Sequence, residues 1–226
     1  MQRAMTTFHT FELRAIDVEA SRDFYARLLG IAPWVTPLPA RARERGAPAH
    51  WLGRLVVPSL EGALAHVRAR GGSTLGPVGE KSAVCRDPGG AVFGLSFDLS
   101  SASSNATAPF AWHELHTDDV NRAFDFYAGM APWRRGAPLD ASPEVQFDGA
   151  RLLAGGLGAV LETVGRVPGL HPHWLFYAAV EDLPRALELV RGEGGRVQYG
   201  PTEGPGGRTF AICEDHEGAA FGLQRC

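Results

Sequence analysis

The 226-residue sequence has no run of about 18 apolar residues and no long basic stretch, and only three of its residues are cysteine. The first absence argues against a membrane-spanning helix, and residues 1–10 lack the apolar core and cleavage site of a signal peptide. With 22 basic against 25 acidic residues, the formal net charge is −3. Such a surface releases few counterions, so we expect no nucleic-acid partner. The cysteines share no metal-type spacing, and we expect a reducing, cytoplasmic location.

The sequence does contain a repeat of itself. Residues 11–26 match residues 113–128 at a shift of 102, with 8 of 16 positions identical. Residues 50–72 match residues 173–195 at a shift of 123, with 11 of 23 identical, and residues 84–95 match residues 212–223 at a shift of 128. The chain is therefore a duplication. We expect a first domain at residues 1–97, a small polar linker at residues 98–109, and a second domain at residues 110–226.

Helical and strand periods alternate inside each repeat. Residues 112–117 predict a strand, and Asp119 predicts the N-cap of a helix whose apolar residues follow the i, i+3, i+4, i+7 spacing. Residues 173–180 predict another strand, followed by a helix that ends at a glycine pair and then by three short strands. This order is a βαβββ module. Two modules per repeat predict an α+β protein with a curved sheet in each repeat.

The repeats differ in one place. Trp34 and His50 are separated by 15 residues, whereas Trp133 and His173 are separated by 39. The extra 24 residues suffice for about three short strands with turns, which we expect at residues 143–147, 150–154 and 158–163. We therefore expect a loop in the first repeat, which would lack about three strands. Its open sheet edge must be covered, either by an apolar interface between the repeats or by a homodimer.

Several motifs of the second repeat resemble a known family. They are residues 112–119 (WHELHTDD), 154–157 (AGGL), 171–174 (HPHW), 207–210 (GRTF) and 215–223 (DHEGAAFGL). They resemble the two-domain glyoxalase-like proteins of actinobacteria, of the type labelled antigen or hydroxylase, within the glyoxalase/bleomycin-resistance/dioxygenase (vicinal oxygen chelate) superfamily. The resemblance covers essentially the whole chain and implies tandem βαβββ modules. It specifies no reaction, because this fold hosts lyases, isomerases, dioxygenases and drug-sequestering proteins.

Metal-using members of this superfamily hold a divalent ion with histidine and carboxylate side chains. The resemblance places the histidine ligands on apolar residues or threonine, and the last-strand glutamate on glycine; the positions are Thr10, Leu52 and Gly94 in the first repeat and Trp112, Leu175 and Gly222 in the second. Only Glu162 aligns with a carboxylate ligand. We therefore expect no metal cofactor at the usual position.

A shifted site is the alternative. Side chains alternate along a strand, so Glu114 and His116 share one face, and His173 begins the opposite strand. These three residues form a conceivable two-histidine, one-carboxylate metal site. We do not favour a metal there, because the first repeat keeps Glu12 but has Arg14 where His116 stands, a pattern that suits an internal ion pair.

Two functions stay open. The favoured one is a metal-free protein that binds a small molecule in a concave pocket of the second repeat. Its ligand-binding residues would be Trp112, His173, Tyr177, Phe147 and Trp174. The alternative is an enzyme of the lyase, isomerase or dioxygenase type with a non-standard metal or acid/base site, in which Glu114 and His116 would be catalytic.

Other recurring residues have structural interpretations. The histidines that begin the second module of each repeat can bond backbone at a strand entry, the mid-strand cysteines are small buried hydrophobes, the turn aspartates are architectural, and the helix tyrosines belong to the core. These residues are His50 and His173, Cys85 and Cys213, Asp87 and Asp215, and Tyr25 and Tyr127.

Overall fold

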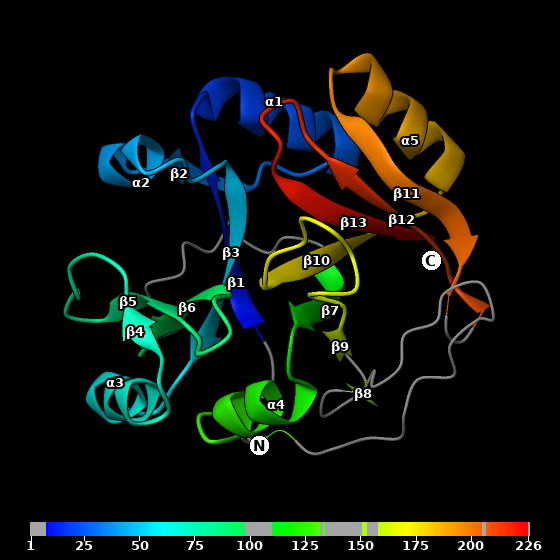
Figure 1. Cartoon of the computed structure of the whole chain (residues 1–226). Coiled ribbons are helices and arrows are strands. Elements are labelled where there is room, and N and C mark those ends of the chain that lie inside the picture. The colour runs from blue at the N-terminus through cyan, green and yellow to red at the C-terminus, as the bar shows by residue number, and fades with distance from the viewer. Residues whose placement is uncertain are drawn as a thin grey trace, which may run out of the picture. The chain divides into compact units, whose positions relative to one another are not determined.

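The structure is a computed structural model that describes residues 8–97, 110–131, 133, 151–152, 158–204 and 207–225 (Figure 1). The elements of the first repeat, called repeat one below, are β1 (Phe8–Ala15), α1 (Val18–Leu29), β2 (Trp34–Pro37), α2 (Ala40–Glu44), β3 (His50–Val56), α3 (Leu60–Ala69), β4 (Ser73–Thr74), β5 (Ser82–Arg86) and β6 (Val92–Ser96). Those of repeat two are β7 (Phe110–Thr117), α4 (Val120–Ala128), β8 (Arg151–Leu152), β9 (Gly158–Glu162), β10 (His173–Val180), α5 (Leu183–Gly192), β11 (Arg196–Glu203), β12 (Thr209–Glu214) and β13 (Ala220–Arg225).

This order confirms the predicted α+β fold with tandem modules. Each of the four longer helices begins at a polar residue whose side-chain oxygen accepts a hydrogen bond from a backbone N–H of the first turn. These N-cap residues are Asp17, Ser59, Asp119 and Asp182. The apolar residues at helical spacing behind each cap are buried. No helix among the described residues is long and apolar enough to cross a membrane.

The prediction of a loop between Trp34 and His50 is wrong in part. Residues 34–37 form β2, which pairs in parallel with β1, and residues 40–44 form the short helix α2. The pairing with β1 satisfies backbone groups that a loop would leave to water. In repeat two, the expected strand at residues 158–163 is present as β9, the strand at 150–154 is present as the two-residue β8, and the strand at 143–147 lies outside the described residues.

The chain divides into two compact units, and neither coincides with a repeat. Among the described residues, unit 1 contains 8–10, 53–97, 113–131, 133, 151–152 and 158–174, and unit 2 contains 11–52, 110–112, 175–204 and 207–225. Each unit therefore combines one half of repeat one with one half of repeat two. The domain boundaries expected from the sequence follow the repeats along the chain and stay a prediction.

Unit 1 contains two groups of hydrogen-bonded strands. Strands β3, β6, β5 and β4 lie in that order, with β3 parallel to β6 and the other pairs antiparallel. Strand β9 pairs in parallel with β7 and antiparallel with β8. Helices α3 and α4 belong to the same unit, where Nε2 of His66 on α3 lies 2.9 Å from the carbonyl oxygen of Phe126 on α4.

Unit 2 repeats this arrangement with other elements. Strands β10, β13, β12 and β11 lie in that order, with β10 parallel to β13 and the other pairs antiparallel. Helix α5 lies along these strands, and α1 lies beside α5 (Figure 1). An ion pair of 2.7 Å between Arg27 on α1 and Glu193 after α5 joins the two helices.

Aromatic side chains join the two repeats inside each unit. In unit 2, Tyr25 of repeat one packs edge-on against Phe221 of repeat two, with 5.4 Å between ring centroids. In unit 1, the equivalent Tyr127 of repeat two packs against Phe93 of repeat one at 5.2 Å. All four rings are buried. The apolar interface between the repeats that the sequence predicted is therefore present, and it occurs twice.

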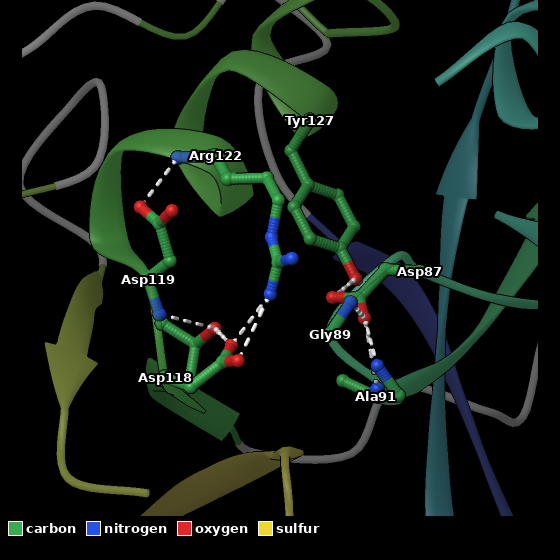
Figure 2. A network of polar contacts seen from close by, with 9 residues as sticks. Asp87, Gly89, Ala91, Asp118, Asp119, Arg122 and Tyr127 are labelled. Atoms are coloured by element: carbon green, nitrogen blue, oxygen red, sulfur yellow. Dashed lines mark hydrogen bonds and ion pairs between the residues drawn. The ribbon is translucent and has the colours of Figure 1, made fainter. Parts of the chain in front are cut away.

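A buried hydrogen-bond chain accompanies this interface in unit 1. Nε1 of Trp174 donates to the hydroxyl of Tyr127 over 2.9 Å, and that hydroxyl donates to Oδ2 of Asp87 over 3.1 Å. Oδ1 of Asp87 accepts three backbone N–H groups from residues 89–91 at 2.7 to 2.9 Å. Figure 2 shows the phenol ring pointing from α4 into this turn. The turn of repeat one is thus fastened to the helix of repeat two.

Unit 2 contains the same chain with the repeats exchanged. Nε1 of Trp51 donates to the hydroxyl of Tyr25 over 3.0 Å, and the hydroxyl donates to Oδ2 of Asp215 over 3.1 Å. Burial raises the pKa of the Asp215 carboxyl, against the opposing effect of its backbone hydrogen bonds. Burial, followed by the nearby carboxylate, raises the pKa of Tyr25 well above its usual range. The tyrosine therefore stays protonated and keeps donating.

Candidate functional site

The predicted residues Glu114, His116 and His173 lie together in unit 1. Glu114 and His116 stand two positions apart on β7, and Oε2 of Glu114 is 3.7 Å from Nε2 of His116. The imidazole rings of His116 and His173 are stacked, with 4.7 Å between centroids and 8° between planes. Thr163, directly after β9, places its hydroxyl oxygen 2.9 Å from Nδ1 of His116. We call these four residues the polar cluster of unit 1.

Sequence reasoning missed Thr163, although β9 was expected to reach it. The feature that would have identified Thr163 is the parallel pairing of β9 with β7, in which His116 lies opposite Leu161. Thr163 follows Leu161 by two positions, so its side chain lies on the same side of the sheet as that of Leu161. No pattern within the sequence of β9 alone identifies it, because the partner is 47 residues away.

Burial decides the charge of the cluster. The side chain of His116 is 7% exposed, and burial, assisted by His173, lowers its pKa to about 3. Burial also lowers the pKa of His173, whose Nδ1 lies 2.7 Å from the carbonyl oxygen of His171. At neutral pH both rings are therefore uncharged beside the carboxylate side chain of Glu114, which is 16% exposed.

Nε2 of His116 is the exceptional atom of this cluster. It is buried, and no described residue forms a hydrogen bond with it. The Glu114 carboxylate, 3.7 Å away, is beyond hydrogen-bond length but favours the tautomer in which Nε2 carries the proton. His116 then accepts from the Thr163 hydroxyl through Nδ1. The imidazole is then neutral, and its Nε2–H group forms no hydrogen bond with a described residue.

Repeat one carries a counterpart of the cluster in unit 2. Glu12 and Arg14 stand at the positions of Glu114 and His116, and Nε of Arg14 lies 3.5 Å from Oε1 of Glu12. The hydroxyl of Thr36 donates to the same carboxylate oxygen over 2.6 Å. The predicted internal ion pair of repeat one is therefore present, whereas repeat two has a neutral histidine in place of the arginine.

The geometry of the histidines bears on metal binding. An imidazole binds a metal through a ring nitrogen, along a lone pair that lies in the plane of the ring. The planes of His116 and His173 are nearly parallel and stacked, so they do not meet near the rings. The two histidines cannot share one ion in this arrangement. In the described part of the chain, no three histidine, cysteine, aspartate or glutamate side chains group in a way that could hold a metal ion.

The two glycines at the expected glutamate position are covered by larger side chains. In the β10–β13 register Tyr177 faces Gly222, and a Cβ atom on that glycine would overlap the tyrosine ring. In the β3–β6 register Arg54 faces Gly94, and a Cβ there would lie 2.5 Å from Cγ of Arg54. Real Cβ atoms do not approach other atoms so closely. In both repeats, a large side chain fills the space where the resemblance expects a carboxylate.

The remaining predicted site residues lie in different surroundings. Trp174 is buried in unit 1, where it bonds Tyr127 and packs against Phe8 at 4.7 Å between centroids, a core position. In unit 2, Tyr177 is 2% exposed and Trp112 is half-buried, with the guanidinium of Arg208 stacked 5.6 Å from its ring centroid. Phe147 lies outside the described residues. The ligand-binding role of these residues stays a prediction.

The buried recurring residues match their structural interpretations. His50 and His173 each place Nδ1 near a backbone carbonyl oxygen two residues earlier, at 2.9 and 2.7 Å. Cys85 and Cys213 are fully buried, and burial raises their pKa values to about 11 and about 12. Thiols in this state are poor nucleophiles.

Comparison with known proteins identifies relatives over most of the chain. CFP32 of Mycobacterium bovis, whose name calls it a glyoxylase, is 27% identical over 200 aligned positions that cover 84% of this chain and 74% of the relative. The anthracycline biosynthesis protein DnrV of Streptomyces peucetius is 27% identical over 260 positions, covering 94% of this chain and 90% of the relative.

Solved structures share the fold at lower identity. The 2,3-dioxygenase LapB from Pseudomonas sp. KL28 aligns with a TM-score of 0.61 and 16% identity, covering 99% of this chain and 94% of that one. The Mn(II)-bound glyoxalase from Novosphingobium aromaticivorans aligns with the same score and identity, covering 100% and 83%. A family model matches residues 109–223, about half of the chain. The chain belongs to the Glyoxalase/Bleomycin resistance protein/Dioxygenase superfamily.

Proposed function

We propose that this protein binds a small organic molecule at the polar cluster of unit 1 and does so without a divalent metal ion. The observation that carries the proposal is the packing of Arg54 over Gly94 in the same unit, which leaves no space for a carboxylate at that position. The stacked rings of His116 and His173 support it, because they do not converge on one point. The residues present therefore do not fit the metal of the family.

The state of His116 supports ligand binding at this place. Leaving a buried polar atom without a hydrogen bond costs about 1–3 kcal/mol, and Nε2 of His116 is such an atom. A ligand with an acceptor atom recovers that cost, and a donor group of the same ligand can bond the partly exposed carboxylate of Glu114 beside it. The stacked, neutral imidazole rings also provide an aromatic surface against which an unsaturated or aromatic ligand can pack.

The second candidate function is an enzyme in which Glu114 and His116 act as an acid/base pair. The distance of 3.7 Å between Oε2 and Nε2 favours it, because one oxygen atom of a substrate can contact both groups. The depressed pKa of His116, about 3, makes its imidazole a weak base, so Glu114 would accept the proton. The substrate would be one that loses a proton in a lyase or isomerase reaction.

A thermal-shift screen of aromatic and carboxylate-bearing small molecules tests the proposal, because a ligand that binds the folded state raises the melting temperature. Every compound that stabilises the wild type is then measured with E114Q, which removes a charge at nearly constant volume. The matched control is E12Q, the same substitution in repeat one. We expect E114Q to weaken binding about 10-fold or more, and E12Q to leave the affinity unchanged.

The fate of the ligand separates the two functions. Recovery of the compound unchanged after long incubation supports binding alone. Conversion to product that disappears in E114Q and H116N, while binding persists, supports the enzyme. Ligands that are not converted and that bind wild type and E114Q equally well would show that the binding site lies elsewhere.

A further inference from the structure

The side chain of Arg14 in unit 2 is largely enclosed, yet its Nε–H group is not hydrogen-bonded. The side chain is 17% exposed, and Nε is buried and forms no hydrogen bond with a described residue. The carboxylate of Glu12 lies 3.5 Å from Nε, beyond hydrogen-bond length. A guanidinium has five N–H donors in one plane, and leaving a buried donor without an acceptor is costly. A ligand can supply the acceptor that Arg14 lacks.

The carboxylate of Glu12 is satisfied from another side. Its Oε1 accepts a hydrogen bond from the hydroxyl of Thr36 over 2.6 Å. Thr36 lies opposite Arg14 in the parallel register of β1 and β2, so the hydroxyl reaches the carboxylate from the neighbouring strand. A hydrogen-bonded salt bridge would place an N–H group at about 2.7–2.9 Å from this oxygen. The hydroxyl takes that position instead, which leaves the guanidinium able to bond another group.

The equivalent position of repeat two has a related property. His116, the counterpart of Arg14 at the shift of 102, also contains a buried nitrogen that no described residue bonds. The two donors differ in charge, because burial lowers the pKa of His116 to about 3, whereas an arginine stays protonated at every ordinary pH. Unit 2 therefore offers a cation where unit 1 offers a neutral ring, and the two positions suit different ligands.

His50, the first residue of β3, limits the charge of a ligand in unit 2. Its Nδ1 lies 2.9 Å from the carbonyl oxygen of Pro48, which can only accept, so Nδ1 carries a proton. Burial lowers the pKa of His50, and the charge of Arg14 lowers it further, against the opposing effects of the Pro48 hydrogen bond and of Glu12. The ring is therefore neutral at pH 7. A single cation with a carboxylate neighbour suits a singly charged anion better than a doubly charged one.

An aromatic side chain lies beside Arg14. Trp34 on β2 is opposite Glu12 in the β1–β2 register, two positions before Thr36. Residues in register project from the same face of a sheet, so the indole and the guanidinium share one face. The indole is half-buried, and β2 is the outer strand of its sheet. A flat ring attached to an anionic group can pack against this indole.

We propose that Arg14 and Trp34, beside the neutral ring of His50, form a second binding site that takes a small aromatic monocarboxylate. The two carboxylate oxygens accept N–H groups of the guanidinium, whose planar fork matches them, and the ring of the ligand packs on Trp34. All three residues lie in unit 2. The site therefore does not depend on the polar cluster of unit 1 or on the function proposed for it.

Isothermal titration calorimetry of the full chain with sodium benzoate at pH 7.5 tests the chemistry of the ligand. Benzamide has nearly the same shape without the charge, phenyl phosphate carries mostly two negative charges at this pH, and acetate lacks the ring. We expect benzoate to bind about 10-fold more tightly than each of the three. Benzamide or phenyl phosphate binding as tightly as benzoate would overturn the assignment to a monocarboxylate, and equal binding of acetate would remove Trp34 from the site.

Substitutions of Arg14 test its position in the site. R14M removes the guanidinium and keeps a long side chain, so the affinity for benzoate should fall about 10-fold or more. R14K keeps the charge without the planar fork and should bind with intermediate affinity. Because R14M leaves the buried Glu12 without a nearby cation, the double variant E12Q/R14M is measured as well, with urea unfolding as the check of its fold. The matched control is R22M, which removes a partly exposed arginine of α1 that pairs with Glu19, and should leave the affinity unchanged.

Loss of benzoate binding in R14M and in a folded E12Q/R14M, with R22M unchanged, supports the proposal. No binding of benzoate at concentrations up to about 10 mM would overturn it, as would equal affinity of the wild type and E12Q/R14M. The variant E114Q distinguishes this site from the polar cluster of unit 1. An affinity for benzoate that falls in E114Q and not in R14M would assign the ligand to the polar cluster, which overturns the second site and leaves the proposed function intact.

Discussion

The hydroxyl of Tyr127 donates a hydrogen bond to Asp87, a residue 40 positions earlier in the chain, over 3.1 Å. The equivalent tyrosine of repeat one, Tyr25, bonds Asp215 over the same distance across 190 positions. Each unit thus depends on both repeats, and the tyrosines hold the turns that precede the last strands.

We expect Y127F to lower the free energy of unfolding by about 1–3 kcal/mol, because it removes the hydrogen bond to Oδ2 of the buried Asp87 carboxylate and the one that the Trp174 N–H donates to the tyrosine hydroxyl. Y25F should have an effect of the same size in unit 2. Urea unfolding of each variant measures it. The control is Y199F, whose residue is 40% exposed. Equal stability of Y127F and the wild type would show that the hydrogen-bond chain is not a stabilising element.

Gly222 should tolerate no side chain. We expect G222A to destabilise the protein by about 1–3 kcal/mol, because the new methyl group overlaps the ring of Tyr177. The control G192A adds a methyl group in open space. In a double-mutant cycle with Y177A, the two substitutions should be strongly non-additive. Additive effects in that cycle would mean that Tyr177 does not occupy the space beside Gly222.

The stability of the protein should depend on pH through His116. Burial lowers its folded pKa to about 3, whereas the unfolded chain keeps the usual value near 6.5. Between these pKa values the unfolded state binds more protons than the folded state. The free energy of unfolding therefore carries no penalty from His116 above about pH 6.5, and it decreases as the pH falls below that value. The loss is about 1.4 kcal/mol per pH unit.

The variant H116Q removes this titration. Asp87 and Asp215, whose pKa values are raised, act in the opposite direction on the acid side, so the test is the difference between variant and wild type. Urea unfolding from pH 4 to pH 7 should give a shallower loss of stability in H116Q. Parallel curves would contradict the burial of a neutral His116.

The duplication made much of the fold predictable. Matching segments located β7, β10, α4 and α5, since the spacing of buried residues such as Leu183 and Leu187 survives in both copies. The segment after Trp34 was not predictable, because β2 forms only through its pairing with Glu12 and the following residues of β1. Local sequence does not contain that partner.

The candidate site was predictable only in part. Strand alternation placed Glu114 and His116 on one face, and the structure brings His173 to them. Strand alternation could not show that the rings of His116 and His173 stack, nor that Thr163 bonds the ring of His116. The same alternation places the side chains of Trp174 and His173 on opposite faces of β10. Trp174 is a core residue because it bonds Tyr127, which lies on a helix 47 positions earlier and so could not be identified from the strand alone.

Metal analysis of freshly purified protein, prepared without added metal, tests the central claim most directly. We expect well under one equivalent of any transition metal per chain and a melting temperature unchanged by EDTA, since Tyr177 and Arg54 fill the expected ligand space and the histidine rings are stacked. A stoichiometric ion that is lost in H116N or H173N would contradict the account and would favour the enzyme over the binding protein.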